Sequence, residues 1–167
     1  MNKLAVITYY NGNYKKIAKL CENLDFKVLF YNKRNDDFGL KVKNIGVDVY
    51  DKFHFIVKNY HNLPEIVLFL TDTSFDSIKK RRQIEFILEN HFILYERSGF
   101  LTGHIFGIQD NDISFSLENY KNKKLLKAKY RPFGFWLKER ILDVPNVCDA
   151  FISKKGVFAV TKDLIMS

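Results

Sequence analysis

The sequence predicts an α/β fold in which a mostly parallel sheet is flanked by helices. Apolar runs typical of strands buried on both faces occur at residues 4–10, 26–31 and 65–71. Segments with helical periodicity separate these runs, which is the pattern of parallel strands joined by crossover helices. The length of 167 residues fits one domain, so we expect residues 1–167 to form a single unit.

The N-terminal part predicts a strand, a helix and a second strand. Leu4–Tyr10 is continuously apolar, and Asn11, Gly12 and Asn13 end it with residues typical of turns. After this turn, apolar residues recur every three or four positions, which indicates a helix. They are Tyr14, Ile17, Ala18, Cys21 and Leu24. Phe26–Tyr31 predicts the second buried strand.

A second strand–loop–helix–strand order follows. Residues 33–46 are polar and charged and predict a loop. Asp48 is suited to the start of a helix, where a carboxylate interacts with free amides. This helix has an apolar stripe made of Val49, Phe53, Ile56, Val57 and Tyr60. Pro64 ends it, and the strand at Glu65–Thr71 ends at Asp72.

The rest of the chain predicts shorter elements. Asp76 or Ser77 is suited to cap a helix that carries apolar residues up to Leu88. Further elements are expected as strands at 92–95, 101–108, 113–117 and 157–160, and as a short helix at 135–142.

Composition restricts the class of protein and its partners. Aromatic residues make up 16% of the chain, which argues against disorder, and two cysteines exclude a disulfide scaffold. The first apolar run is too short to span a membrane and no cleavage site follows it, so we expect a cytoplasmic protein. A net charge of +8, concentrated at residues 79–82 and 121–131, favours an anionic partner. A peripheral contact with an anionic membrane fits this charge. Nucleic acid is less favoured, because no nucleic-acid-binding motif is present.

The expected ligand site lies beyond the carboxyl ends of the parallel strands. The polar and aromatic residues at these ends are Tyr9, Tyr10, Asn11, Asn32 and Asp72. Asp72 follows a buried strand, a common position for a carboxylate that holds a divalent cation beside substrate phosphates. Asp76 is either a second metal ligand or a helix cap. No phosphate-binding glycine-rich loop and no hydrolase constellation competes with this interpretation.

Three motifs follow one another along the chain: Lys43-Asn-Ile-Gly46, Tyr60-His-Asn-Leu-Pro64 with the strand after it, and Gly156-Val-Phe-Ala-Val-Thr-Lys162. Their order resembles a family of small glycosyltransferase-like domains. The resemblance implies a small GT-A fold and transfer of a sugar from a nucleoside diphosphate sugar to a glycan or lipid-linked acceptor, with Mn²⁺ or Mg²⁺. It also adds Asn44 and Gly46 to the nucleotide-sugar site. Because the chain ends soon after the last motif, it is either a minimal member or a shortened chain.

The resemblance also implies roles for single residues. Asp72 matches the position where the family carries a metal-binding Asp-x-Asp, but this chain reads Asp72-Thr73-Ser74. Asp76 or a backbone group would replace the missing ligand. Inverting transfer needs a carboxylate that takes the proton of the acceptor hydroxyl, for which the candidates are Asp149 and Glu139. Cations from residues 121–131 would approach the diphosphate if no metal is bound.

Two other functions remain open at this point. One is a non-catalytic domain of the same fold that binds a nucleotide or a partner protein. The other is a basic nucleic-acid-binding protein.

Overall fold

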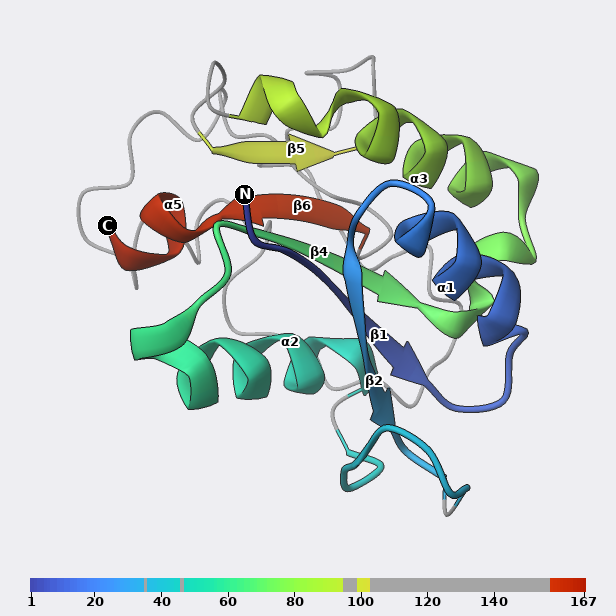
Figure 1. Cartoon of the computed structure of the whole chain (residues 1–167). Coiled ribbons are helices and arrows are strands. Elements are labelled where there is room, and N and C mark those ends of the chain that lie inside the picture. Colours follow the sequence, from blue (N-terminus) through green and yellow to red (C-terminus); the bar gives the residue numbers. More distant parts are fainter. Residues whose placement is uncertain (35, 46, 95–98, 103–156) are drawn as a thin grey trace, which may run out of the picture. The chain divides into compact units, whose positions relative to one another are not determined.

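Strands and helices alternate along the chain and assemble into a sheet with helices on both faces (Figure 1). The computed structural model describes residues 1–34, 36–45, 47–94, 99–102 and 157–167. These residues belong to the unit formed by Met1–Gly103 with Ser153–Ser167. The elements expected at 113–117 and 135–142, and the basic segment 121–131, lie outside the described residues.

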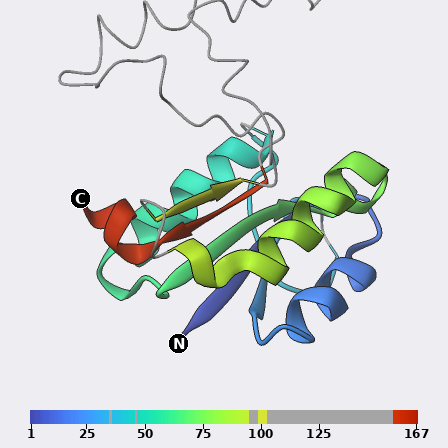
Figure 2. The ribbon, with the colours of Figure 1, turned by 90° about the horizontal axis from the view of Figure 1, so that it is seen from above.

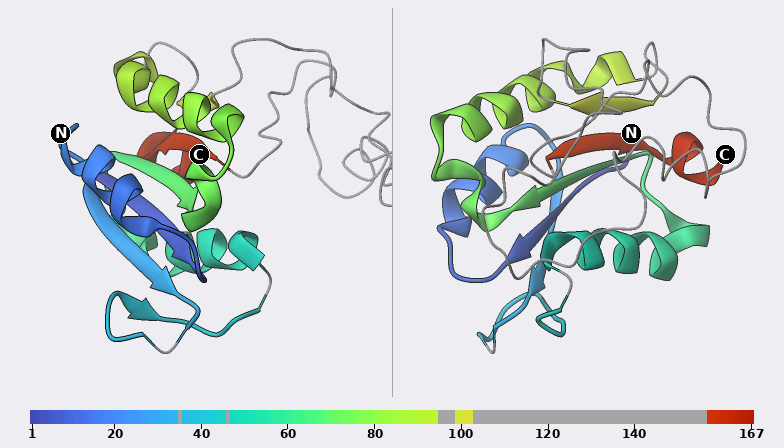
Figure 3. Two further views of the ribbon diagram at one scale, coloured as in Figure 1. Left: turned by 90° about the vertical axis from the view of Figure 1, so that its right-hand side faces the viewer. Right: turned by 180° about the vertical axis from the view of Figure 1, so that it is seen from behind.

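The sheet is mixed, and β1 lies between β2 and β4 in the order β3-β2-β1-β4-β6-β5. The described strands are β1 Lys3–Tyr9, β2 Lys27–Asn32, β3 Leu40–Lys41, β4 Ile66–Thr71, β5 Phe100–Thr102 and β6 Phe158–Thr161. β1 pairs in parallel with β2 and β4, and β2 pairs in parallel with β3. β6 runs antiparallel to its neighbours β4 and β5, as two further views show (Figure 3). Among the described strands only β6 is therefore reversed, which confirms the mostly parallel sheet.

Helices pack on the two faces of this sheet (Figure 2). The α-helices are α1 Tyr14–Glu22, α2 Val47–Asn59, α3 Ile78–Asn90 and α5 Lys162–Met166. Short 3₁₀ helices are η1 Tyr60–Asn62, η2 Asp72–Phe75 and η3 His91–Leu94. α1 and α3 lie on one face and α2 lies on the other. Among the described helices, none has the length and hydrophobicity needed to cross a membrane.

The alternation of side chains along β1 explains why its sequence is continuously apolar. Ala5 and Ile7 pack into one core cluster together with Ile17 of α1. Val6 points to the opposite face and packs into a second cluster with Phe55 of α2. Because helices cover both faces, both sets of alternating side chains are removed from water.

α2 presents a different face to the sheet than its apolar stripe predicts. Val49, Phe53 and Val57 are 53%, 64% and 74% exposed. On the inward face, Asp51 is completely buried and Phe55 is 2% exposed. The helix is correctly predicted, but most of its stripe is on the outer face. Ile56 alone of the stripe packs against the second core cluster, and the inward face carries charged residues.

Two further predictions are corrected at element boundaries, and one pair of alternatives is decided. The strand expected at 92–95 is wrong for the described residues 92–94. They belong to η3, a 3₁₀ turn that continues the end of α3, and such turns are a common ending for α-helices. The loop expected at 33–46 contains the two-residue strand β3, which pairs with the end of β2. Ser77 is the N-cap of α3, whereas Asp76 ends η2.

The orientation of α2 is testable with a matched pair of phenylalanines. We expect Phe55→Ala to lower the free energy of unfolding by about 3–5 kcal/mol, because it removes a buried ring. Phe53→Ala should change it by less than about 0.5 kcal/mol, because this ring is exposed. Urea denaturation of both variants measures the difference. Equal losses would contradict the assignment of the inward face.

Candidate functional site

The carboxyl edge of the parallel strands gathers five of the seven residues that the sequence assigns to nucleotide-sugar binding. Tyr9 at the end of β1 is the register partner of Asn32 at the end of β2. Tyr10 and Asn11 follow β1 directly, and Asp72 follows the neighbouring strand β4. The expected grouping of these five residues at one edge of the sheet is therefore present.

Asp72 binds the backbone of the loop between β1 and α1. Three consecutive N–H groups donate to its Oδ2 atom: those of Tyr10 at 2.7 Å, Asn11 at 2.7 Å and Gly12 at 2.6 Å. Successive amides that converge on one point form a concave anion-binding arrangement. Here the anion is a carboxylate of the same chain, which is 3% exposed. Asp72 therefore links the end of β4 to the loop after β1.

Gly12 makes this close approach sterically allowed. A Cβ atom at this position would lie 2.7 Å from the carbonyl oxygen of Asp72 and 2.8 Å from its carbonyl carbon. Such contacts are shorter than van der Waals separations, so any larger residue would push the loop away from η2. The turn signal at Asn11 and Gly12 thus has a specific cause in the packing of the loop against η2.

Asn32 shapes the loop that follows β2. Its Nδ2 donates to the carbonyl oxygens of Asp36 and Phe38, each at 2.9 Å, and its Oδ1 accepts from the amide of Arg34 at 2.8 Å. The residue is completely buried. Its amide therefore holds the loop in place, although the sequence singled it out as a ligand-binding group.

The two tyrosines at the end of β1 differ in exposure. Tyr9 is 7% exposed, and its ring packs against Tyr14 and Phe38 with centroid distances of 5.2 and 4.8 Å. Tyr10 is 54% exposed. Beside it, the guanidinium of Arg34 donates to Oδ1 of Asn11. Tyr10 is therefore the most exposed aromatic side chain among the described residues at this edge.

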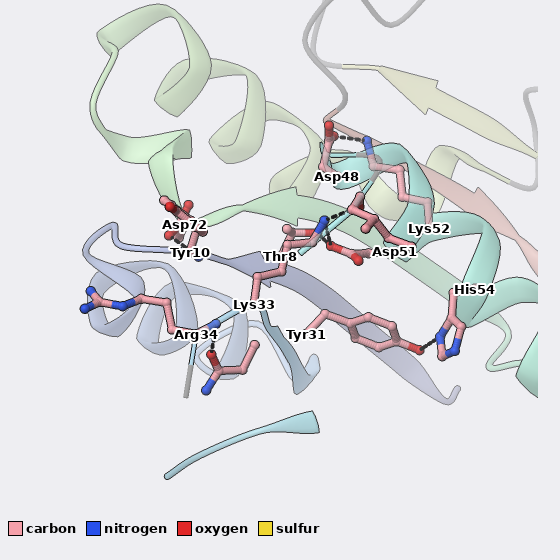
Figure 4. A network of polar contacts seen from close by, with 12 residues as sticks. Thr8, Tyr10, Tyr31, Lys33, Arg34, Asp48, Asp51, Lys52, His54 and Asp72 are labelled. Atoms are coloured by element: carbon pink, nitrogen blue, oxygen red, sulfur yellow. Dashed lines mark hydrogen bonds and ion pairs between the residues drawn. The ribbon is translucent and has the colours of Figure 1, made fainter. Parts of the chain in front are cut away.

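A buried polar cluster on the α2 side of the same edge is not predicted from the sequence (Figure 4). Thr8 Oγ1 donates to Asp51 Oδ2 at 2.8 Å, and Lys33 Nζ lies 3.3 Å from the same oxygen. Lys33 Nζ also donates to the carbonyl oxygen of Ile45 at 2.9 Å. The second oxygen of Asp51, Oδ1, is buried without a hydrogen-bond partner among the described residues. This cluster joins β1, the loop after β2 and α2.

A second ion pair lies one turn away on α2. Lys52 Nζ is 2.6 Å from Asp48 Oδ2 and 5.3 Å from the ring centroid of Phe158. One feature of the sequence indicates that the charged residues of α2 belong together. Asp48, Asp51 and Lys52 have the spacing that places them on one helical face, opposite the apolar stripe. A charged helix face opposite a clear apolar stripe normally faces solvent, which is why the sequence did not reveal this cluster.

Burial controls the proton affinity of the cluster. It raises the pKa of Asp51, and the Thr8 hydroxyl and the Lys33 ammonium oppose that rise. Burial, and after it the carboxylate of Asp51, raises the pKa of the neighbouring Tyr31 to about 12. Tyr31 Oη lies 3.3 Å from Nδ1 of His54.

The remaining predicted site residues are placed apart from this cluster or are not described. Asn44 is exposed in the loop before α2. Asp76 is exposed on the other side of the edge, where it lines a cavity with Lys16 and Arg81. Gly46, Glu139 and Asp149 lie outside the described residues.

The predicted metal site has no complete ligand set in the described part of the chain. No three His, Cys, Asp or Glu side chains there are grouped to hold a metal ion. Asp72 Oδ2 already accepts three amide hydrogens, which leaves Oδ1 as its oxygen for a cation. We assign no reaction step to Mn²⁺ or Mg²⁺, and the metal requirement stays a prediction.

Comparison with known proteins assigns the chain to no family. No protein-family model, no curated protein and no solved structure matches the chain.

The contact between Asp72 and the loop is testable against Asp76. We expect Asp72→Ala to lower the free energy of unfolding by about 2–4 kcal/mol, because three amides lose a charged acceptor. Asp76→Ala removes the same group from an exposed position and should cost less than about 0.5 kcal/mol. Urea denaturation gives both values, and hydrogen exchange at residues 10–12 should accelerate only in Asp72→Ala. Unchanged exchange there would contradict the role of Asp72.

The buried carboxyl of Asp51 predicts a pH dependence of stability. Because its pKa is raised in the folded protein, the folded state binds this proton more tightly than the unfolded chain does. The contribution of Asp51 to stability should therefore fall as pH rises from its ordinary value near 3.8 through the raised folded value. Asp51→Asn cannot titrate, so the stability of wild type relative to this variant should decrease with rising pH. A difference that is constant or increases with pH, measured by urea denaturation, would contradict this.

Proposed function

We propose that the protein is a glycosyltransferase that transfers a sugar from a nucleoside diphosphate sugar to a glycan or lipid-linked acceptor. The donor binds beyond the carboxyl ends of β1, β2 and β4. One observation carries this proposal: five of the seven residues that the sequence assigns to nucleotide-sugar binding lie at this edge, where Asp72 holds the loop that carries Tyr10 and Asn11. In open α/β sheets this is the edge where ligands bind.

The sheet supports the finer proposal of a GT-A-type fold. Four parallel strands are followed by the reversed strand β6, which is inserted between β4 and β5. This arrangement is compatible with the fold that the sequence resemblance implies. The helices on both faces also agree with it.

The chemistry of donor binding assigns roles to the exposed groups at this edge. The ring of Tyr10 stacks on the nucleobase, since every base offers an aromatic face. Departure of a diphosphate requires that its developing negative charge is stabilised. Arg34 is the cation at the end of β2, next to Asn11, that serves this purpose.

The buried cluster of Thr8, Lys33 and Asp51 holds together the elements that end at this edge. Thr8, Lys33 and Asp51 connect the strand end, the following loop and α2, so they fix the relative positions of the exposed groups. Oδ1 of Asp51 has no hydrogen-bond partner among the described residues. Because unsatisfied buried groups are rare in folded proteins, this atom supports a functional role for the cluster in addition to its structural one. The base that takes the acceptor proton is still predicted to be Asp149 or Glu139.

Nucleotide binding at Tyr10 is the direct test of this proposal. Calorimetric titration of UDP and of GDP, with and without Mn²⁺, should show binding to the wild type. Tyr10→Ala should weaken binding about 5- to 150-fold, because it removes a stacking partner worth about 1–3 kcal/mol. Tyr60→Ala is the matched control, since this exposed tyrosine precedes β4 at the opposite edge and its loss should leave affinity unchanged.

Each outcome of this titration separates the alternatives. A higher affinity with Mn²⁺ would support the predicted metal, and equal affinity would indicate that cationic side chains replace it. Nucleotide binding without release of nucleoside diphosphate from any sugar donor would favour the non-catalytic domain. No binding of either nucleotide would contradict the transferase proposal.

A further inference from the structure

A cavity of about 380 Å³ lies on the face of the sheet that carries α1 and α3. Its lining residues are Asn13, Lys16, Phe75, Asp76 and Arg81. They come from the loop before α1, the first turn of α1, the end of η2 and the first turn of α3. The volume is within the range of small-molecule sites. The buried cluster around Asp51 is on the opposite, α2 face, so the cavity is a separate feature.

The guanidinium of Arg81 is held in place from two sides. Its Nε donates to Glu85 Oε1 at 2.8 Å, and its Cζ lies 5.7 Å from the ring centroid of Phe75. These contacts use the inner nitrogen and one face of the plane. The outer N–H groups, which bind planar or tetrahedral anions through paired hydrogen bonds, have no partner in the described residues. The Arg81 side chain is 56% exposed, and its outer N–H groups face no described partner, so they are available to an anion in the cavity.

The helix dipoles disfavour the two cations of this cavity, and the carboxylates of Asp76 and Glu85 offset part of that effect. Lys16 and Arg81 lie in the opening turns of α1 and α3, where the helix dipole already places positive charge. Neither helix has an acidic residue in its first turn. An anion bound between the two side chains would offset this repulsion. Within the basic segment 79–82, Arg81 therefore has more than a solvent-facing role.

The other lining groups restrict the chemistry of the ligand. Asp76 is a carboxylate, so a ligand with only acceptor atoms would be repelled on that side. Hydroxyl groups satisfy it, because they donate to a carboxylate, and Asn13 both donates and accepts. Phe75 offers apolar contact for the carbon skeleton.

We propose that this cavity binds a phosphorylated polyol, such as a sugar phosphate. The phosphate lies between Lys16 and Arg81, and the hydroxyl groups contact Asp76 and Asn13. The same chemistry occurs in soluble sugar phosphates and in the headgroups of phosphoinositide lipids. This inference does not rest on the proposed transferase activity.

Two matched pairs of variants test the cavity. Glucose 1-phosphate is titrated by calorimetry into the wild type, into the cavity variants Lys16→Ala and Arg81→Ala, and into the neighbouring controls Lys15→Ala and Arg82→Ala. All four changes remove one exposed positive charge, but only the first two alter the cavity lining. We expect the cavity variants to bind about tenfold more weakly or worse, because each loses a charge-assisted hydrogen bond. The controls should stay within about twofold of wild type.

The outcomes distinguish a built site from a diffuse basic surface. Equal weakening in all four variants would overturn the proposal, because it would show attraction to overall charge. Binding of inorganic phosphate as tightly as glucose 1-phosphate would overturn the role of the polyol groups. Tyr10→Ala should leave the affinity for glucose 1-phosphate unchanged, so failure of nucleotide binding and failure of this proposal can be told apart.

Binding to lipid vesicles distinguishes a lipid headgroup from a soluble sugar phosphate as the ligand. Phosphatidylcholine vesicles that contain phosphatidylinositol 4-phosphate are compared with vesicles of equal charge that contain phosphatidylserine. Binding to the phosphoinositide vesicles that requires Arg81 but not Arg82 would support a lipid headgroup as the source. Binding of glucose 1-phosphate without this preference would support a soluble ligand. Absence of both would overturn the proposal.

Discussion

The carboxylate of Asp72 determines the geometry of the candidate site. It is the first residue after β4, yet its three hydrogen bonds go to consecutive amides of the loop after β1. This contact positions both Tyr10, which is exposed at the strand end, and Asn13, which lines the cavity beside α1. The amides that would otherwise bind an external anion are occupied by a group of the same chain. A ligand at this edge must therefore be recognised by side chains rather than by these amides.

The inward charges of α2 are the second constraint on the edge. Taking Lys33 and Asp51 out of water costs free energy that their attraction only partly returns, so the pair is poor evidence for stability. Its geometric effect is clearer, because it joins the loop after β2 to α2, and Thr8 joins both to β1. The arrangement fixes the ends of adjacent elements relative to one another. A site that binds a flexible diphosphate sugar needs this kind of rigidity.

Local sequence patterns predict the framework, whereas contacts between distant residues decide the site. β1, α1, β2 and β4 follow from continuous apolar runs and one helical stripe, since each signal is contained within the element itself. The orientation of α2 could not be predicted this way, because Val49, Phe53 and Val57 form the more hydrophobic stripe but face outward. Asp72 was singled out for its position after a strand, but its partners are about sixty residues away in the chain. Only the folded arrangement shows that it binds the loop.

The most direct test of the account is the location of a bound nucleotide. Amide chemical-shift changes in ¹⁵N-labelled protein, recorded during titration with UDP and GDP, map that location residue by residue. We expect changes concentrated at residues 9–12 and 32–34, at the carboxyl ends of β1 and β2. Changes confined to the opposite edge, around Tyr60 and His61, or no changes at saturating nucleotide would contradict it.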